Sequence, residues 1–192
     1  YLTVPRVIRV WLSGQLPRRV SAKDIILEIL RRMSSKGNVG KVLEYAGPGL
    51  AALSVPQRAT IANMGAELGV TTSIFPSDEK TRQYLAAQGR AAHWEPLTAD
   101  DDARYDDAFE VNLSTLEPLV ALPHHPDNVV PVSQAAGLPV QQVLVGSCTN
   151  GGYADLSLVA KMVAGRRVAE GVSFGVTPAS RQVLRALAKT SH

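Results

Sequence analysis

Strand-like and helix-like segments alternate between residues 7 and 90 of the chain. The predicted strands cover residues 7–12, 41–45 and 70–75, and the predicted helices cover residues 22 to about 36, 55–68 and 78–88. Glycine or proline separates most of these segments, as is typical of repeated strand–helix units. Because such units build parallel or mixed sheets with helices on their faces, the chain is predicted to have an α/β fold with three α/β/α layers.

The predicted helix at residues 55–68 has clear start and stop signals. Ser54 can cap its first turn, and Gln57 can reach back to the backbone of the capping residue. Pro56 lies in the first turn, where its missing N–H costs nothing, and Gly69 suits the left-handed position after the last turn. Local chemistry therefore predicts both ends of this helix.

An acidic loop at residues 98–107 interrupts the alternation, a short strand is predicted at residues 109–113, and a proline-containing linker follows at residues 121–128. Strands are predicted again at residues 140–145 and 172–177, and helices at residues 153–164 and 181–189. We therefore expect a complete α/β domain at residues 1–125 and the first part of a second, similar α/β domain at residues 126–192. Two parallel strands are too few for an independent sheet, so they either join the first sheet or belong to a larger domain.

Composition excludes several classes of protein. With 192 residues, 45% hydrophobic and 19% charged, the chain is long and apolar enough to bury a core. A single cysteine excludes an internal disulfide, and no apolar run reaches the length of a membrane span. The net charge of +3 is scattered and aromatic residues make up 5%, which argues against nucleic-acid binding. A cytoplasmic protein is expected, or a mitochondrial-matrix protein in a eukaryote.

The one cysteine, Cys148, lies in a turn between a predicted strand and a predicted helix. The apolar run Val143–Val145 ends at Gly146, and Ser147, Thr149 and Asn150 surround the cysteine with polar groups. Ligands of parallel α/β sheets bind where strands end and helices begin, so this turn is a candidate site. The alternative is an inert thiol buried in the protein.

Two polar residues share a face of the helix predicted at residues 55–68. Asn63 and Glu67 are four positions apart, so their side chains lie one turn apart on the same side. A carboxylate and a carboxamide on a largely apolar helix form a second candidate site. The alternative is a solvated polar face, or a Glu67 paired with an arginine.

Two other polar clusters do not predict a metal site. Five aspartates between residues 100 and 107 lack the spacing and central glycine of an EF-hand, which favours a solvated loop. His124 and His125 are adjacent, so in an extended chain they point in opposite directions and do not suit one metal ion.

Four motifs, in this order, resemble the aconitase superfamily, which includes aconitate hydratase, isopropylmalate dehydratase and homoaconitase. They are Glu-Tyr-Ala-Gly-Pro-Gly at residues 44–49, Thr-Ile-Ala-Asn-Met-Gly-Ala-Glu-Leu-Gly at 60–69, Thr-Ser-Ile-Phe-Pro at 72–76 and Gly-Ser-Cys-Thr-Asn at 146–150. The similarity spans essentially the whole chain. The sequences of the motifs near residues 65–76 resemble aconitate hydratases more closely than isopropylmalate dehydratases.

This resemblance implies an iron–sulfur hydro-lyase of the tricarboxylic acid cycle that interconverts citrate and isocitrate by dehydration and rehydration. Alternatively, the substrate is isopropylmalate or homoaconitate. Cys148 corresponds to the first of three cysteines that bind a 4Fe-4S cluster. Asn63 and Glu67 correspond to residues that face the cluster's open iron: Asn63 would hydrogen-bond the iron-bound oxygen, and Glu67 would position the leaving hydroxyl or its protons. The implied partners are a tricarboxylic or dicarboxylic acid and either the remaining aconitase domains or a separate small subunit.

The chain also departs from the family pattern. It contains neither the Asp-Ser-His triplet nor the Cys-x-x-Cys pair, and Gly151 and Ala179 stand where serine and glycine are common. One thiolate cannot hold a four-iron cluster. We therefore expect the chain to be the central fragment of a larger enzyme, inactive and without cluster by itself. The Asn63–Glu67 face and the Cys148 turn are predicted to converge on one cavity in that enzyme.

Two further functions compete with the hydro-lyase. The first is a hydrolase with Cys148 as nucleophile and His124 or His125 as base, although Asn150 replaces the second glycine of the nucleophile-elbow pattern. The second is a cluster-free binding module, as in aconitase relatives that bind RNA. The scattered charge and scarce aromatic residues argue against RNA binding by this chain.

Overall fold

The computed structural model describes residues 3–190, and the chain divides into two compact units between Ala136 and Gly137. Each unit is described by itself. None of the described helices combines the length and the apolar character that a membrane crossing requires.

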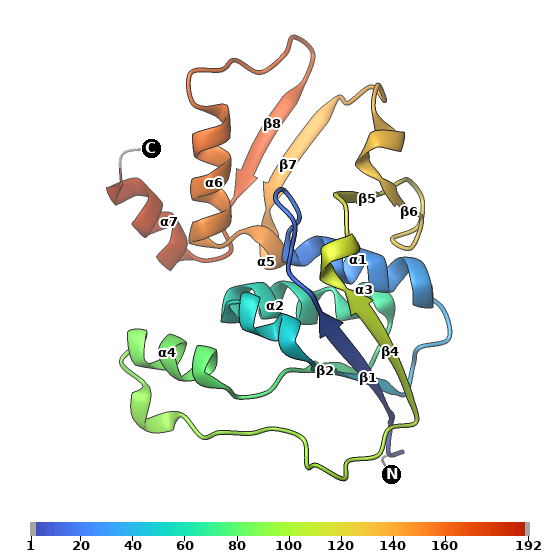
Figure 1. Ribbon diagram of the computed structural model, residues 1–192. Coiled ribbons are helices and arrows are strands. Elements are labelled where there is room, and N and C mark those ends of the chain that lie inside the picture. Colours follow the sequence, from blue (N-terminus) through green and yellow to red (C-terminus); the bar gives the residue numbers. More distant parts are fainter. Residues whose placement is uncertain (1–2, 191–192) are drawn as a thin grey trace. The chain divides into compact units, whose positions relative to one another are not determined.

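The first unit is built on a four-stranded parallel sheet (Figure 1). Its strand order is β3-β2-β1-β4, and every neighbouring pair is parallel. The strands are β1 (Arg6–Ser13), β2 (Lys41–Ala46), β3 (Thr72–Ile74) and β4 (Asp107–Asn112). The predicted α/β class with a parallel sheet is confirmed.

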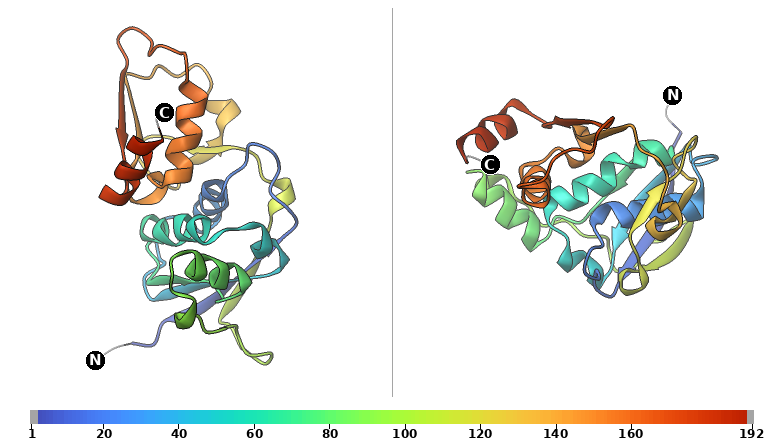
Figure 2. Two further views of the ribbon diagram at one scale, coloured as in Figure 1. Left: turned by 90° about the vertical axis from the view of Figure 1, so that its left-hand side faces the viewer. Right: turned by 90° about the horizontal axis from the view of Figure 1, so that it is seen from above.

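Helices connect these strands, and α1 (Ala22–Met33) and α2 (Val55–Asn63) lie together on one side of the sheet (Figures 1 and 2). The remaining helical segments are the short helices η1 (Pro48–Ala52), η2 (Ala91–His93) and η3 (Leu113–Thr115) and the α-helices α3 (Gly65–Leu68) and α4 (Glu79–Ala87). A capping box at Ser21 and Asp24 starts α1, and one at Ser54 and Gln57 starts α2, as the sequence predicts.

The core follows the two-residue period of β1. Ile8, Val10 and Leu12 are at most 4% exposed, and they belong to one hydrophobic cluster with the buried residues of α1. The other side chains of β1 point to the opposite face, where Trp11 is 40% exposed. Helices therefore cover the two faces of this sheet less evenly than the predicted three-layer arrangement implies.

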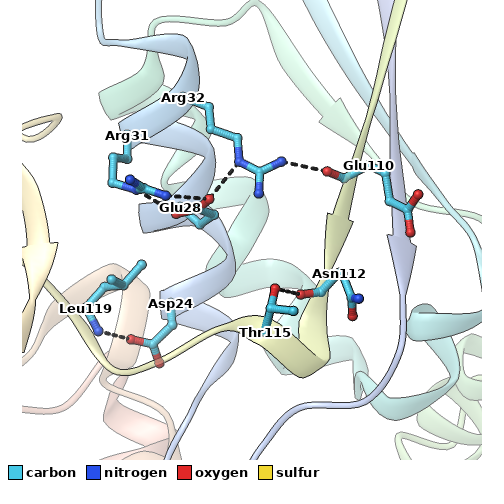
Figure 3. A network of polar contacts seen from close by, with 8 residues as sticks. All are labelled: Asp24, Glu28, Arg31, Arg32, Glu110, Asn112, Thr115 and Leu119. Carbon is cyan, nitrogen blue, oxygen red and sulfur yellow. Dashed lines mark hydrogen bonds and ion pairs between the residues drawn. The ribbon is translucent and has the colours of Figure 1, made fainter.

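Polar contacts that involve two buried carboxylates join α1 to β4 and to the Leu119 segment (Figure 3). Asp24 accepts a hydrogen bond from the backbone N–H of Leu119 at 2.8 Å. Glu28 accepts hydrogen bonds from Arg31 and Arg32, and Arg32 also donates to the Glu110 carbonyl of β4 at 2.6 Å. Burial alone would raise the pKa of Glu28, but the hydrogen bonds from Arg31 and Arg32 outweigh it and lower the pKa.

Residues 119–136 belong to the first unit. β5 (Leu119–Ala121) and β6 (Val129–Pro131) form an antiparallel pair, which the short helix η4 (Val132–Ala135) follows. Val129 is buried in the core cluster of the first unit. The predicted domain boundary, between residues 125 and 126, therefore lies before the observed one, between residues 136 and 137. The reason is that the linker packs against the first unit and buries the side chain of Val129 there.

Within residues 137–190, the second unit contains two parallel strands and three helices. They are β7 (Gln142–Gly146), α5 (Ser147–Asn150), α6 (Tyr153–Val163), β8 (Ser173–Thr177) and α7 (Arg181–Lys189). The two strands form a sheet of their own and do not join the first sheet. Leu156 is 4% exposed, but Leu144, Leu158 and Met162 are each at least 60% exposed. In the described structure this unit therefore has a small core and much apolar surface.

Replacing Gly47 with alanine should destabilise the first unit. Gly47 has φ +99°, and an added Cβ would meet the backbone carbonyl oxygen of Leu12. We expect Gly47→Ala to cost about 3 kcal/mol or more, since overpacking adds to the strain of a positive φ. Gly37→Ala is the matched control, because Gly37 has φ +77° but open space around it. Its expected cost is about 1–2 kcal/mol. Equal urea midpoints by circular dichroism for the two variants would contradict the close approach at Gly47.

Asp127 should make the stability of the first unit depend on pH. Its carboxylate accepts hydrogen bonds from the Ser34 hydroxyl at 2.6 Å and from the Ser35 N–H and hydroxyl at 2.8 and 3.0 Å. The Ser34 bond, followed by those of Ser35, lowers the pKa of Asp127 strongly. A lowered folded-state pKa stabilises the fold above the unfolded pKa of about 3.9, and the stabilisation is lost as pH falls through the folded value.

Asp127→Asn should therefore be less stable than the parent chain at pH 7. The difference should shrink progressively below about pH 4. Asp101→Asn, in an exposed loop, is the control and should show no such pH-dependent difference. Urea unfolding at several pH values measures both. A penalty for Asp127→Asn that is the same at pH 7 and at pH 3 would refute the assignment.

Candidate functional site

The Cys148 turn follows directly on the carboxyl end of β7. Gly146, with φ +129°, ends the strand, and a Cβ at this position would overlap the carbonyl oxygen of Thr177 in β8. The backbone N–H of Ala179 donates to the carbonyl of Gly151 at 2.9 Å and ties the end of the turn to the segment after β8. The turn is therefore held at the edge where parallel sheets place their ligands.

The Cys148 side chain is exposed. Its sulfur lies 3.9 Å from the Ser147 hydroxyl, which donates to it, and 3.7 Å from the Thr149 hydroxyl. Asn150 donates to Asp155 at the start of α6, at 3.3 Å. The exposure contradicts the alternative of an inert buried thiol and leaves the sulfur accessible to a metal or an electrophile.

The thiol of Cys148 suits a ligand of an iron–sulfur cluster, but one cysteine is too few to hold a whole cluster. Within residues 3–190, no group of three or more histidine, cysteine, aspartate or glutamate side chains could hold a metal ion. The sequence contains one cysteine, whereas a four-iron cluster needs three or four protein thiolates. The side chains of this chain can therefore contribute to a cluster but cannot complete one.

Asn63 and Glu67 lie at the junction of α2 and α3. Asn63 is the last residue of α2, and Met64 separates it from α3, which contains Glu67. The Leu68 N–H donates to the Met64 carbonyl at 3.3 Å, so the helical hydrogen-bond pattern continues through the junction. Both side chains are exposed, and among the ion pairs of the described residues none includes Glu67. The alternative of a Glu67 held by an arginine therefore has no support within the described residues.

Arg58 fixes the helix that carries Asn63. The Arg58 side chain is 5% exposed and forms an ion pair with Asp78 at 2.6 Å. It also donates to the carbonyls of Leu50 and Pro76, each at 3.2 Å. Burial would raise the pKa of Asp78, but the hydrogen bond from Arg58 outweighs this and lowers it. The sequence did not reveal this pair, because nothing local connects two residues twenty positions apart.

The two candidate sites lie in different units, Asn63 and Glu67 in the first and Cys148 in the second. Their predicted convergence on one cavity stays a prediction. The histidines proposed for a hydrolase, His124 and His125, are exposed residues of the first unit, and the described part of the second unit contains no histidine. No histidine base for Cys148 is therefore found among the described residues of its own unit.

The fold and the position of the cysteine define an α/β protein with a polar site at a strand end. The model of the aconitase family (aconitate hydratase) matches residues 1–139 and 134–191. The chain therefore belongs to the aconitase family, and the resemblance seen in the four motifs is confirmed at the level of the superfamily.

Relatives refine this assignment. A protein named 3-isopropylmalate dehydratase large subunit 2, from Archaeoglobus fulgidus, is 43% identical over 190 residues, 98% of this chain and 46% of the relative. The 3-isopropylmalate dehydratase large subunits of Nitratidesulfovibrio vulgaris and Methanopyrus kandleri are 43% and 39% identical over 94% and 95% of the chain, and 43% and 44% of their own lengths. The chain thus spans less than half the length of these relatives. They do not support the expectation that it is closer to aconitate hydratase or belongs to the tricarboxylic acid cycle.

The exposed thiol of Cys148 should react in the folded protein. We expect a disulfide-exchange reagent such as dithionitrobenzoate to titrate one equivalent of thiol without denaturant, because the side chain is exposed. Cys148→Ser, which should release no thiol signal, is the control. A thiol that reacts only after urea is added would show that the turn is buried and remove it as a candidate site.

Proposed function

We propose that the chain is the central part of a hydro-lyase large subunit that removes water from, and returns it to, 3-isopropylmalate. The observation that carries this proposal is 43% identity over 98% of the chain to a protein named 3-isopropylmalate dehydratase large subunit 2. The citrate–isocitrate reaction is a second candidate, since the matching family is described as aconitate hydratase. Alone, the 192 residues are proposed to be inactive.

Cys148 is proposed to be one of three thiolates that hold a 4Fe-4S cluster in the complete enzyme. Its exposure, its place at a strand end and the two neighbouring hydroxyls support this role. When bound, such a cluster supplies a Lewis acid for the departure of a hydroxyl group. A cysteine that must remain reduced also favours a cytoplasmic enzyme.

Asn63 and Glu67 are proposed to act on the substrate. The Glu67 carboxylate is exposed and has no ion pair among the described residues, so it is available to give or take a proton at the hydroxyl that leaves or returns. The Asn63 carboxamide, one helical turn earlier, can donate a hydrogen bond to the same oxygen. The Arg58–Asp78 ion pair would keep this helix in place.

Two binding partners are proposed for this enzyme, a small subunit and a small-molecule substrate. The relatives named large subunits imply a separate small subunit, and more than half of each relative lies outside the matched region. The missing cysteines and the remaining substrate-binding residues would come from these parts. The substrate would be a small hydroxylated dicarboxylic acid.

A chimeric enzyme tests the proposal. The matched segment of the Archaeoglobus fulgidus large subunit is replaced by this chain and combined with its small subunit. We expect dehydration of 3-isopropylmalate and little turnover of citrate. Glu67→Gln should lower kcat by about 10²–10⁴, as loss of a general acid or base does. Cys148→Ser should abolish both activity and the cluster's visible absorbance.

Glu79→Gln is the control for both substitutions, because Glu79 is an exposed residue of α4 outside the proposed site. Its chimera should match the unsubstituted one. Preferential turnover of citrate would support the second candidate. Full activity of the Glu67→Gln chimera, or full cluster content of the Cys148→Ser chimera, would overturn the roles proposed for these residues.

A further inference from the structure

The first unit contains a cavity that neither Asn63 nor Glu67 lines. It has a volume of about 510 Å³ and lies at the carboxyl ends of β2 and β3. Its lining is mainly apolar, and includes Leu50, Ile74, Phe75 and Leu97. This volume lies within the range of small-molecule sites, and the carboxyl ends of parallel strands are where such sites form.

Fixed contacts hold the walls of this cavity. The rings of Tyr45 and Phe75 are stacked, with centroids 4.3 Å apart and planes inclined by 3°. Ser77 and Leu97 exchange two backbone hydrogen bonds, at 2.8 and 3.1 Å, which place the Leu97 segment beside the end of β3. The cavity is therefore formed without a ligand, which reduces the cost of binding one.

Two backbone acceptors of the wall are already used. Arg58 donates to the carbonyls of Leu50 and Pro76, as described above. A ligand that enters the cavity thus meets chiefly hydrocarbon and aromatic surface from these residues. Thr98 contributes a hydroxyl to the lining, and the charged recognition must come from another side chain.

Glu44 is that side chain. It lines the cavity, is partly buried, and accepts a hydrogen bond from the Tyr105 hydroxyl at 2.7 Å. Arg9 is its register partner on β1, but the Arg9 guanidinium stacks over the rings of Trp11 and Tyr105, at 5.4 and 5.1 Å. Among the ion pairs of residues 3–190, none includes Glu44. An apolar cavity thus carries one carboxylate that no ion pair neutralises.

We propose that this cavity binds a small organic ammonium ion, a protonated amine on an apolar body. The ammonium group would donate to Glu44, and the body would contact Ile74, Leu97 and the Phe75 ring. A dicarboxylate would be repelled by Glu44, so this site is separate from the one proposed for the substrate. Its existence does not depend on the hydro-lyase assignment.

Three probes of similar shape test the charge requirement. Phenethylammonium, the neutral 2-phenylethanol and the anionic 3-phenylpropionate are titrated into the 192-residue chain and followed by amide shifts in ¹⁵N–¹H spectra. We expect saturable shifts at residues around Ile74 and Leu97 with phenethylammonium, and binding of the alcohol weaker by about tenfold or more, as the loss of a charged hydrogen bond predicts. Equal binding of all three probes, or no saturable shifts with phenethylammonium, would overturn the proposal.

Glu44→Gln keeps the shape of the side chain and removes its charge. It should weaken phenethylammonium by about tenfold or more and leave the alcohol unchanged. Glu110→Gln, on β4 and outside the cavity, is the matched control and should bind like the parent chain. If Glu44→Gln does not fold by circular dichroism, Ala46→Leu fills the cavity and keeps the charge, and should abolish binding of both probes. If folded Glu44→Gln or folded Ala46→Leu binds phenethylammonium as tightly as the parent chain does, the proposed site is refuted.

Discussion

The burial of one face of β1 is the constraint on which the first unit depends. β1 is paired in parallel on both sides, with β2 and with β4, and its inward side chains, Val10 and Leu12, are fully buried. Each such side chain contributes about 1.5–3 kcal/mol when removed from water. A shift of β1 by one residue would exchange Val10 and Leu12 for Arg9 and Trp11, so the register of the whole sheet is specified. The hydrogen bonds of Asp24 with Leu119 and of Arg32 with Glu110 then join α1 to the segments packed near it.

In this arrangement the structural polar groups of the first unit are buried, whereas the residues of the candidate sites are exposed. Arg58, Asp24 and Glu28 are buried, and each forms side-chain hydrogen bonds within the first unit. Asn63 and Glu67 are exposed at a helix junction that the same unit holds in place, and Cys148 is exposed at a strand end of the second unit. In α/β proteins a rigid sheet commonly supports exposed reactive groups at its edges. Membership of the aconitase family gives these exposed residues a chemical context.

The uneven covering of the sheet by helices bears on the second proposed binding site, the cavity beside Glu44. Parallel sheets are usually covered on both faces, yet Trp11 and Ile74 are each at least 40% exposed on one face here. The cavity beside Glu44 opens at this face, where a carboxylate stands against an apolar wall. Its chemistry suits a cation, whereas the hydro-lyase substrate proposed here is an anion. The two proposals thus place ligands of opposite charge at two different places of the first unit.

Local sequence chemistry was sufficient to determine the helix starts at Ser21 and Ser54 and the alternation of β1, since capping and side-chain period act over a few residues. The turn predicted at Cys148 is instead the short helix α5. Four short motifs were also sufficient for the family, although their wording favoured aconitate hydratase, which the relatives do not support. Only the tertiary structure decided that residues 126–136 return to the first unit, that Arg58 pairs with Asp78, and that β7 and β8 form their own sheet. These features depend on contacts between segments far apart in sequence, and no local pattern encodes which distant surface a given side chain will meet.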